Sequence, residues 1–244
     1  MLNRQRPFVR QEGLGFDLSL PSGFGLGLGG DVDPILAYDL SLYLNGSRGK
    51  FTAGDVPANG GQVATWVDLL GSGDNATQTV GANQPLDEGD SLYFNGAGDH
   101  MDLSLSNGVS FTYMVDVEIL DATAIRYFGR VYTAGGHFRL GWNAGNLYCY
   151  DSLGELTGHM GAAIPLNERA VVGCTYDAED NLFTWYKNGV AYNTITPSST
   201  LGIYDSAMLS SSSTDPENKQ YNVLSASRAL TAAEMLEISN LLLP

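Results

Sequence analysis

Carboxylates spaced for acid–base catalysis occur in two short stretches of the sequence. They are Asp116, Glu118 and Asp121 in "DVEILD", and Asp177, Glu179 and Asp180 in "DAEDN". Glycoside hydrolysis needs two carboxyl groups that face one cleft, and on a strand such groups stand two residues apart because side chains alternate between faces. Asp116 and Glu118 have this spacing, but Asp121 falls on the opposite face, and the second stretch is typical of a turn. We expect solvated edge and turn residues at both places, and no catalytic pair.

Other catalytic motifs are missing from the sequence. The three histidines, His100, His137 and His159, stand apart from one another, and neither H-E-x-x-H nor G-x-S-x-G occurs. Gly25, Gly27 and Gly30 have the G-x-G-x-x-G spacing, but Asp and Pro follow where a nucleotide-binding helix would begin. We therefore predict that the chain is not an enzyme and has no catalytic residues.

Two oxygen-rich loops could hold a calcium ion. "FNGAGDHMD" offers Asn95, Asp99 and Asp102, and "LDEGD" offers Asp87, Glu88 and Asp90. Carboxylate and carbonyl oxygens are the ligands that Ca²⁺ prefers, but an acidic protein that binds no metal has similar loops. No cofactor is expected, and Ca²⁺ at Asn95, Asp99 and Asp102 is the alternative.

Aromatic residues in one segment have the pattern of a sugar-binding platform. Tyr148 and Tyr150 share one phase of "NLYCYDS", Asp151 follows them, and Trp142 lies shortly before. Aromatic side chains pack against sugar rings while nearby polar groups bind the sugar hydroxyls. The chain has 13 tyrosines, however, and most tyrosines of a β protein pack at the core edge or contact other subunits. Both interpretations of these four residues stay open.

The charge balance excludes two classes of partner. The 244 residues contain 12 Lys+Arg and 27 Asp+Glu, a formal net charge of −15, and such a surface repels phosphate backbones and anionic lipids. We therefore expect binding to neither nucleic acid nor membrane. "MLNRQRPFVR" has no apolar core after its charges, and no apolar run reaches the roughly 20 residues of a membrane span. We expect no secretory signal and no transmembrane segment.

Residues 1–33 differ in composition from the rest of the chain. The first ten residues hold three arginines and no acid, and "GFGLGLGGDVDP" is Gly-rich with interspersed Leu and Phe. A cationic segment on an acidic body favours an extended arm that docks on an acidic partner, including a second copy of the chain. The predicted partner-binding residues are Arg4, Arg6, Phe8, Arg10, Phe16 and Phe24. A disordered start of the chain is the alternative.

From about residue 36 the hydrophobic pattern mostly has a period of two. In "FTYMVDVEIL" the odd-numbered residues from Phe111 to Ile119 share one face. Asn-Gly, a pair favoured in tight hairpins, occurs five times, and many short strands with such turns predict a β-sandwich. Cys149 and Cys174 fall on the apolar phase of their strands, so we expect buried free thiols, with a disulfide as the alternative.

One α-helix is predicted, in "LTAAEMLEISNLLL". Thr231 suits the N-cap, Glu234 completes a capping box, and Leu230 and Met235 have the spacing of a hydrophobic staple. An apolar stripe then runs through Met235, Ile238 and Leu242. The helix is therefore expected to lie on the sandwich.

Four segments complete a recognisable pattern: "VATWVDLLGSGDNATQ", "SLYFNGAGDHMDL", "NLFTWYKNGVAYN" and "RALTAAEMLEISNLL". Between about residues 36 and 243 the chain resembles concanavalin A-like, laminin-G-like jelly rolls. That superfamily includes lectins, glycan-binding modules, some glycosidases and many virion proteins of tailed phages. The resemblance implies an all-β, two-sheet antiparallel jelly-roll sandwich at 34–244, with one C-terminal helix and the extended N-terminal arm of 1–33.

The same resemblance makes "TWVDLLGSGDNATQ" a structural turn. Trp66 would pack in the core, Asp68 would accept hydrogen bonds from turn amides, and Gly71, Gly73 and Asn75 would supply the backbone angles. Asn75-Ala76-Thr77 also fits the glycosylation triplet, but without a secretory signal we expect no modification there.

The favoured function is that of a non-enzymatic structural or decorating protein of a tailed-phage particle. The chain would be a homo-oligomer on the virion surface, with the jelly roll facing outward and the arm docking on other virion proteins or on copies of itself. A lectin-like module that binds a cell-surface glycan, with or without Ca²⁺, is the alternative. A divergent glycosidase that uses Asp116 or Glu118 is the third hypothesis.

Overall fold

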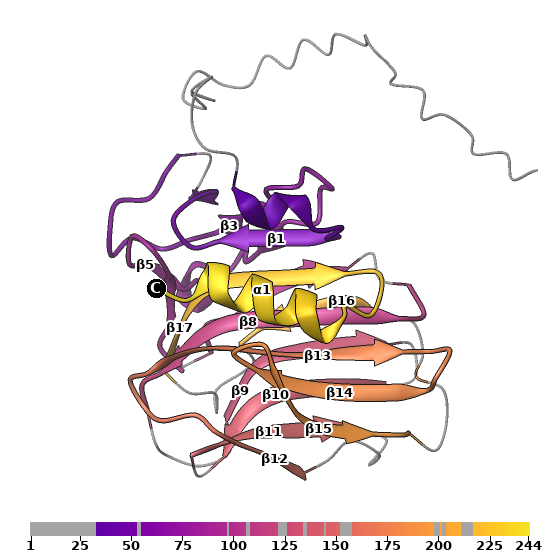
Figure 1. Ribbon diagram of the computed structural model, residues 1–244. Coiled ribbons are helices and arrows are strands. Elements are labelled where there is room, and N and C mark those ends of the chain that lie inside the picture. Colours follow the sequence, from indigo (N-terminus) through magenta and orange to yellow (C-terminus); the bar gives the residue numbers. More distant parts are fainter. Residues whose placement is uncertain are drawn as a thin grey trace, which may run out of the picture. The chain divides into compact units, whose positions relative to one another are not determined.

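The folded unit is a sandwich of two facing β-sheets with one α-helix (Figure 1). The computed structural model describes residues 33–52, 55–96, 98–105, 108–121, 126–133, 136–143, 145–151, 158–197, 201, 204–210 and 217–244. Pro34–Pro244 forms one compact unit. The arm residues Arg4, Arg6, Phe8, Arg10, Phe16 and Phe24 lie outside the described residues. Within the described ranges, no helix has the length and apolar character needed to cross a membrane.

Sheet A has eight strands and sheet B has nine in the described chain. In order of hydrogen-bonded neighbours, sheet A contains β15 (Val190–Ile195), β14 (Leu182–Lys187), β13 (Arg169–Asp177), β8 (Phe111–Ile119), β17 (Asn218–Ala226), β6 (Leu92–Phe94) and β5 (Leu86–Asp87), and β1 (Leu42–Asn45) also pairs with β17. Sheet B contains β12 (Gly158–Ala163), β11 (Asn146–Asp151), β10 (Gly136–Asn143), β9 (Arg126–Thr133), β16 (Tyr204–Leu209), β7 (Met101–Ser104), β4 (Ala76–Thr77), β3 (Thr65–Trp66) and β2 (Lys50–Phe51). Neighbouring strands run antiparallel in both sheets, which confirms the predicted all-β sandwich.

Alternation along the strands builds the core between the sheets. The odd-numbered residues of β8 from Phe111 to Ile119 are fully buried there, as predicted. Aromatic rings from the neighbouring strands pack with them: the Phe111 and Tyr176 centroids lie 5.8 Å apart, and those of Phe183 and Trp185 lie 4.6 Å apart. These separations are typical of favourable aromatic pairs. Sheet A is thus anchored to the core by large side chains.

Cys174 belongs to the same core. Its thiol is free and fully buried, and burial raises its pKa well above the usual value. The prediction of a buried free thiol is confirmed for Cys174. The side chain of Cys149 lies outside the described residues.

The outer face of β8 is also buried, which contradicts the expectation for Asp116. β8 is an inner strand, flanked by β13 and β17, and a second apolar cluster that includes Met114 and the helix residues Met235 and Ile238 covers part of its outer face. Asp116 is 0% exposed, so the prediction of a solvated edge residue is wrong there. The turn between β13 and β14 is exposed at Glu179 and Asp180, as predicted.

The helix α1 (Ala232–Leu242) begins as the sequence predicts. The Thr231 side chain accepts a hydrogen bond from the Glu234 backbone, and the Glu234 carboxylate accepts one from the Thr231 backbone at 2.8 Å, which completes the capping box. Met235, Ile238 and Leu242 are buried against Leu224 of β17 and other residues of sheet A. Figure 1 shows α1 lying across the outer face of that sheet. The short 3-10 helix η1 (Pro34–Ala37) contacts it.

The helix cap should make stability depend on pH in acid. Hydrogen bonds from Arg228 and Thr231 lower the pKa of Glu234 from 4.5 to about 2, so the ionised carboxylate stabilises the fold above pH 4.5 and this contribution is lost as the pH falls toward 2. In Glu234→Gln we expect a flatter stability profile across that window. Urea unfolding at several pH values measures it, with Glu179→Gln in the exposed turn as the control. Equal slopes in wild type and Glu234→Gln would contradict the role of this carboxylate.

The stretch "TWVDLLGSGDNATQ" is a structural turn. Trp66 is fully buried, and Asp68 is a buried acceptor for the backbone amides of Tyr43, Leu70 and Ser72, at 2.9 to 3.1 Å. Gly71 and Gly73 have φ of +74° and +91°, as the turn requires. Asn75 contributes differently from the prediction: its backbone is not left-handed, and its side-chain oxygen accepts a hydrogen bond from the Asp68 backbone at 2.9 Å.

The Asn-Gly pairs do not all form the same turn. Only Asn188-Gly189, between β14 and β15, has positive φ at both described residues, +49° and +75°, which is the signature of a type I′ hairpin. At 45–46 neither residue is left-handed, because the Gly46 amide instead donates to the Tyr221 carbonyl. Long-range contacts therefore override the local turn preference.

Candidate functional site

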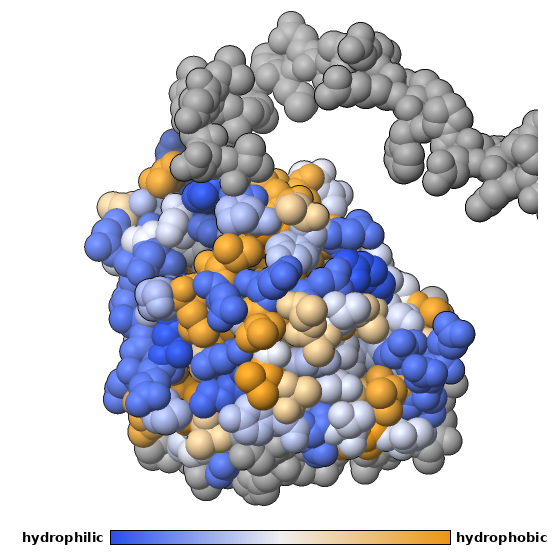
Figure 2. Space-filling model, viewed as in Figure 1, coloured by the Kyte–Doolittle hydropathy of each residue, from blue (hydrophilic) through white to orange (hydrophobic). Residues whose placement is uncertain are grey.

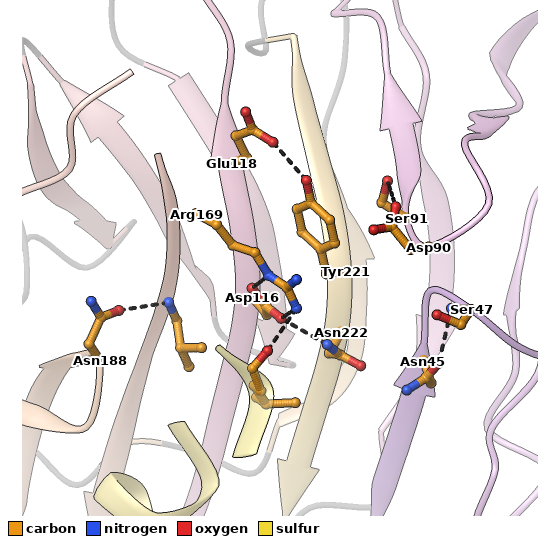
Figure 3. A network of polar contacts seen from close by, with 12 residues as sticks. Asn45, Ser47, Asp90, Ser91, Asp116, Glu118, Arg169, Asn188, Tyr221 and Asn222 are labelled. Carbon is orange, nitrogen blue, oxygen red and sulfur yellow. Dashed lines mark hydrogen bonds and ion pairs between the residues drawn. The ribbon is translucent and has the colours of Figure 1, made fainter. Parts of the chain in front are cut away.

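The carboxylates spaced for catalysis lie on the outer face of sheet A, where Figure 3 shows their partners. Arg169 of the adjacent strand β13 binds both oxygens of Asp116, with Nε–Oδ1 at 2.8 Å and Nη2–Oδ2 at 2.5 Å. Asn222 Nδ2 donates a further hydrogen bond to Oδ2 at 2.8 Å. Burial raises the pKa of Asp116, and Arg169 and Asn222 oppose that rise. Both oxygens are bound to protein groups and the residue is fully buried, so Asp116 presents no oxygen to a substrate at the surface.

Glu118 is also engaged with a neighbour. It accepts a hydrogen bond from the Tyr221 hydroxyl at 2.7 Å, and burial together with this carboxylate raises the pKa of Tyr221. The guanidinium carbon of Arg169 lies 3.9 Å from the centre of the Tyr221 ring, a cation–π geometry. A β-bulge in β17 between Gln220 and Asn222 brings Tyr221 and Asn222 together toward Arg169 (Figure 3).

The same network holds the end of the helix. Arg169 Nη2 donates to the Leu242 carbonyl at 2.8 Å, and a cation at a helix C-terminus is favourable because the last carbonyls carry partial negative charge. The network therefore fastens α1 to sheet A. This geometry gives Asp116 and Glu118 a structural role.

Of the three residues predicted to bind calcium, Asn95 and Asp99 are in direct contact. Asp99 is 2% exposed and accepts a hydrogen bond from the Asn95 backbone at 3.1 Å, while Asp102 is exposed on the outer face of sheet B. In the second loop Asp87 pairs with the buried Lys50. Among the described residues no three His, Cys, Asp or Glu side chains lie close enough to hold a metal. A calcium site stays a prediction.

The predicted sugar-binding aromatics fall in different environments. Trp142 is 4% exposed, and its indole N–H donates to the Ile164 carbonyl at 2.8 Å, so its ring packs in the core and offers no open face to a sugar. Tyr148 of β11 is half-buried and alternates with the core residue Leu147, which places it on the outer face of sheet B. The side chains of Tyr150 and Asp151 lie outside the described residues.

Tyr148 belongs to a larger surface that we call the sheet B face. Its members alternate along their strands with core residues such as Ala76, Leu103 and Ala207, and they therefore point away from the core. They are Thr77, Asp102, Ser104, Arg130, Arg139, Tyr148, Ser206 and Met208, and all are half-buried or exposed. This surface mixes hydroxyl, charged and aromatic groups.

A pocket of about 310 Å³ lies on the sheet B face where β4, β7 and β16 meet. It is lined by Asn75, Thr77, Asp102, Leu103, Ser104, Ser206 and Ala207. The polar members offer hydroxyl, amide and carboxylate groups, which together can donate and accept several hydrogen bonds. Of these residues, sequence reasoning picked out only Asp102 as a candidate ligand-binding residue, because strand serines and threonines look like ordinary solvated positions until the register brings them together.

A second hollow lies beside the helix. It measures about 480 Å³ and is lined by Pro34, Ala37, Tyr38, Glu237, Asn240 and Leu241. Figure 2 shows this side of the described chain, where hydrophobic residues gather in small groups separated by hydrophilic ones. The Tyr38 hydroxyl donates to Glu237 at 2.9 Å, which links η1 to α1. Two of the polar groups of this hollow, those of Tyr38 and Glu237, thus serve a structural contact.

Comparison with known proteins identifies relatives by fold only. No family model and no curated protein matches the chain. Among solved structures, Trypanosoma rangeli sialidase in complex with 2,3-difluoro-KDN aligns with a TM-score of 0.62 and 18% identity, over 82% of this chain and 32% of that one. The binding domain of Paraclostridial Mosquitocidal Protein 1 aligns with a TM-score of 0.59 and 14% identity, over 83% and 52%. A mutant of HCR/D aligns with a TM-score of 0.58 and 11% identity, over 83% and 51%.

These similarities cover about a third to a half of each matched chain. At such low identity they establish a shared β-sandwich fold, and fold alone does not specify activity. The assignment of function therefore depends on the sheet B face.

Proposed function

We propose that the chain is a non-enzymatic, concanavalin A-like glycan-binding module that holds its ligand on the sheet B face. The observation that carries this proposal is the pocket lined by Thr77, Asp102, Ser104 and Ser206. Sugar hydroxyls both donate and accept hydrogen bonds, and Ser, Thr, Asn and Asp side chains complement them. The volume of about 310 Å³ is at the small end of ligand pockets, roughly 300 to 1,000 Å³. It suits one part of a longer glycan.

Tyr148 gives the proposed site an aromatic end. β11 stands four strands from β7 in sheet B, which at about 4.8 Å per strand amounts to roughly 19 Å. A glycan of several residues that starts in the pocket and crosses the strands reaches the Tyr148 ring, on which a sugar can pack. The extended face thus favours an oligosaccharide over a single sugar.

The fold neighbours are compatible with this proposal. They include a sialidase, in one structure in complex with sialic acid, and the binding domain of a mosquitocidal protein. For this chain the non-enzymatic part of the proposal is supported by Asp116 and Glu118, whose carboxylates hold the helix and the strands of sheet A.

A place on a phage particle stays a prediction. It depends on docking by residues 1–33, whose partner-binding residues lie outside the described chain. Recognition of a cell-surface glycan by the sheet B face is compatible with a virion protein and with a lectin alike.

The proposal predicts a loss of glycan binding when the pocket loses its hydroxyls. In a Thr77→Val, Ser206→Ala double variant, two hydrogen-bonding groups are replaced by apolar ones of similar size. At about 0.5–1.5 kcal/mol for each bond, the affinity should fall roughly 5- to 150-fold. The full-length protein is first screened on a glycan array with Ca²⁺ and with chelator, and the best glycan is then titrated by calorimetry.

Thr194→Val supplies the matched control, because Thr194 is an exposed strand threonine of sheet A. It should leave the affinity unchanged. The proposal would be contradicted if no glycan of a broad array bound, or if wild type and the double variant had equal affinities. Binding that disappears with chelator would show that it requires a metal ion and would support the calcium prediction.

A further inference from the structure

Two arginines stand opposite each other on the sheet B face. Arg139 of β10 and Arg130 of β9 are Cα partners in neighbouring antiparallel strands. Leu140 and Val131, which follow them in sequence, are buried in the core, so alternation directs both arginines outward, where they are half-buried. Residues directly opposite in such a pair have Cβ atoms about 4.5–5.5 Å apart. The structure therefore brings two guanidinium-bearing side chains side by side.

This arginine pair continues the row of residues that begins in the pocket. From Arg130 the Cα register leads to Met208 of β16 and then to Asp102 of β7, which lines the pocket. Arg130 and Asp102 are thus two strand spacings apart, or about 10 Å. A ligand that extends from the pocket across the strands passes over Met208 and meets the arginines next.

The placement of these arginines runs against the charge balance of the chain. Only 12 of the 244 residues are Lys or Arg, against 27 Asp and Glu. Two arginines at one point concentrate positive potential on an otherwise acidic protein. The planar guanidinium binds carboxylate and sulfate groups through two parallel hydrogen bonds. This arrangement is suited to bind an anionic group of the ligand.

We infer that the sheet B face takes an acidic glycan. An uncharged part of the glycan occupies the pocket, and a carboxylate or sulfate group of an adjoining sugar residue binds at Arg130 and Arg139. This inference rests on the proposed function and adds the chemical class of the ligand. Because the chain as a whole has a net charge of −15, the attraction is local, and salt weakens it by screening the partly exposed arginines.

Matched pairs of glycans test the inference on the full-length protein. One pair is a set of uronic-acid oligomers and their methyl esters, in which each carboxyl group loses its charge and gains a methyl group. The other is a set of sulfated oligosaccharides and their desulfated forms. The acidic member of at least one pair should bind at least 10-fold more tightly than its neutral counterpart, and the pair that shows the difference tells carboxylate from sulfate.

Arginine variants locate the preference. In Arg130→Gln and Arg139→Gln the acidic glycan should lose about 10-fold in affinity, while the neutral counterpart keeps its own. Arg130→Lys keeps the charge without the planar fork and should recover only part of the loss. Arg48→Gln, which removes one charge from the exposed turn after β1, is the control and should change nothing.

The outcomes separate this inference from the proposed function. Neutral glycans that bind as tightly as acidic ones, with binding still lost in the Thr77→Val, Ser206→Ala variant, would overturn the acidic ligand and leave the glycan site standing. An equal loss in Arg48→Gln and Arg130→Gln would show a general charge effect and would also overturn it. Absence of binding to every glycan would overturn both. The wild-type comparison of matched pairs decides the question even where an arginine variant fails to fold.

Discussion

Replacing Arg169 with methionine is expected to lower the free energy of unfolding by about 3–5 kcal/mol, because it leaves a buried carboxylate without its partner. Asp116 is 0% exposed, and Arg169 supplies two of the hydrogen bonds to its oxygens. Arg169→Met also removes the hydrogen bond to the Leu242 carbonyl and the contact with the Tyr221 ring. Urea denaturation followed by tryptophan fluorescence measures the loss.

The two partners of this ion pair should respond unequally. The side chain of Arg169 is 24% exposed, whereas that of Asp116 is 0% exposed. In Asp116→Asn the guanidinium can still reach water, so we expect a smaller loss than in Arg169→Met. The double variant carries no buried charge and should be more stable than Arg169→Met alone. Equal losses in the two single variants would contradict the assignment of the buried charge as the main cost.

The loss in Arg169→Met should also depend on pH. Burial raises the pKa of Asp116 even in the wild type, and removal of Arg169 raises it further because the cation no longer favours the ionised form. A raised folded-state pKa means that stability is retained below the unfolded value of 3.8 and is lost as the pH rises. The difference between wild type and Arg169→Met should therefore be larger at pH 7 than at pH 4.

The sequence predicts those parts of this fold that depend on local pattern. The alternation from Phe111 to Ile119 places five side chains in the core, and the spacing of Thr231 and Glu234 predicts the capping box. Both signals arise within one turn or one strand. They need no knowledge of what packs against them.

The environment of Asp116 could not be predicted in this way. Its partner Arg169 is 53 residues away in sequence, and the contact depends on the pairing of β8 with β13 and on the bulge that turns Tyr221 and Asn222 to one face. A charged residue within an apolar strand looks like a solvated position until the covering helix is placed. Alternation indicates that Asp116 lies on the face opposite the core, but it does not indicate what covers that face. The prediction for Asp116 was wrong for this reason.

The candidate site illustrates the same limit. Thr77, Ser104 and Ser206 come from three strands that lie far apart in the sequence, and the pairings of β4 and β16 with β7 bring them to one pocket. Arg130 and Arg139 become opposite only once the register of β9 and β10 is known. Tyr148, which the sequence did single out, belongs to this face, whereas Trp142 of the same prediction belongs to the core.

Replacing Gly189 with alanine is the second change with a large expected effect, a loss of about 2–5 kcal/mol. Gly189 has φ of +75°, and the left-handed conformation costs a residue with a Cβ about 1–2 kcal/mol. A Cβ at this position would also overlap the Leu236 Cα and lie 2.9 Å from the Leu236 nitrogen and 3.0 Å from the Met235 carbonyl. Those atoms are helix backbone, so relief requires a shift of α1 or of the hairpin, at a further cost of about 1–3 kcal/mol.

Gly71→Ala separates the two causes of that loss. Gly71 has nearly the same φ, +74°, but no atom lies within 4 Å of the position of its Cβ. It should therefore lose only the conformational part, and urea denaturation of both variants gives the steric part as the difference. If Gly189→Ala loses no more than Gly71→Ala, α1 can move away from the hairpin at little cost. A helix α1 that moves so easily would also be inconsistent with a firm anchor at Arg169. This result would therefore contradict the expected effect of Arg169→Met as well as that of Gly189→Ala.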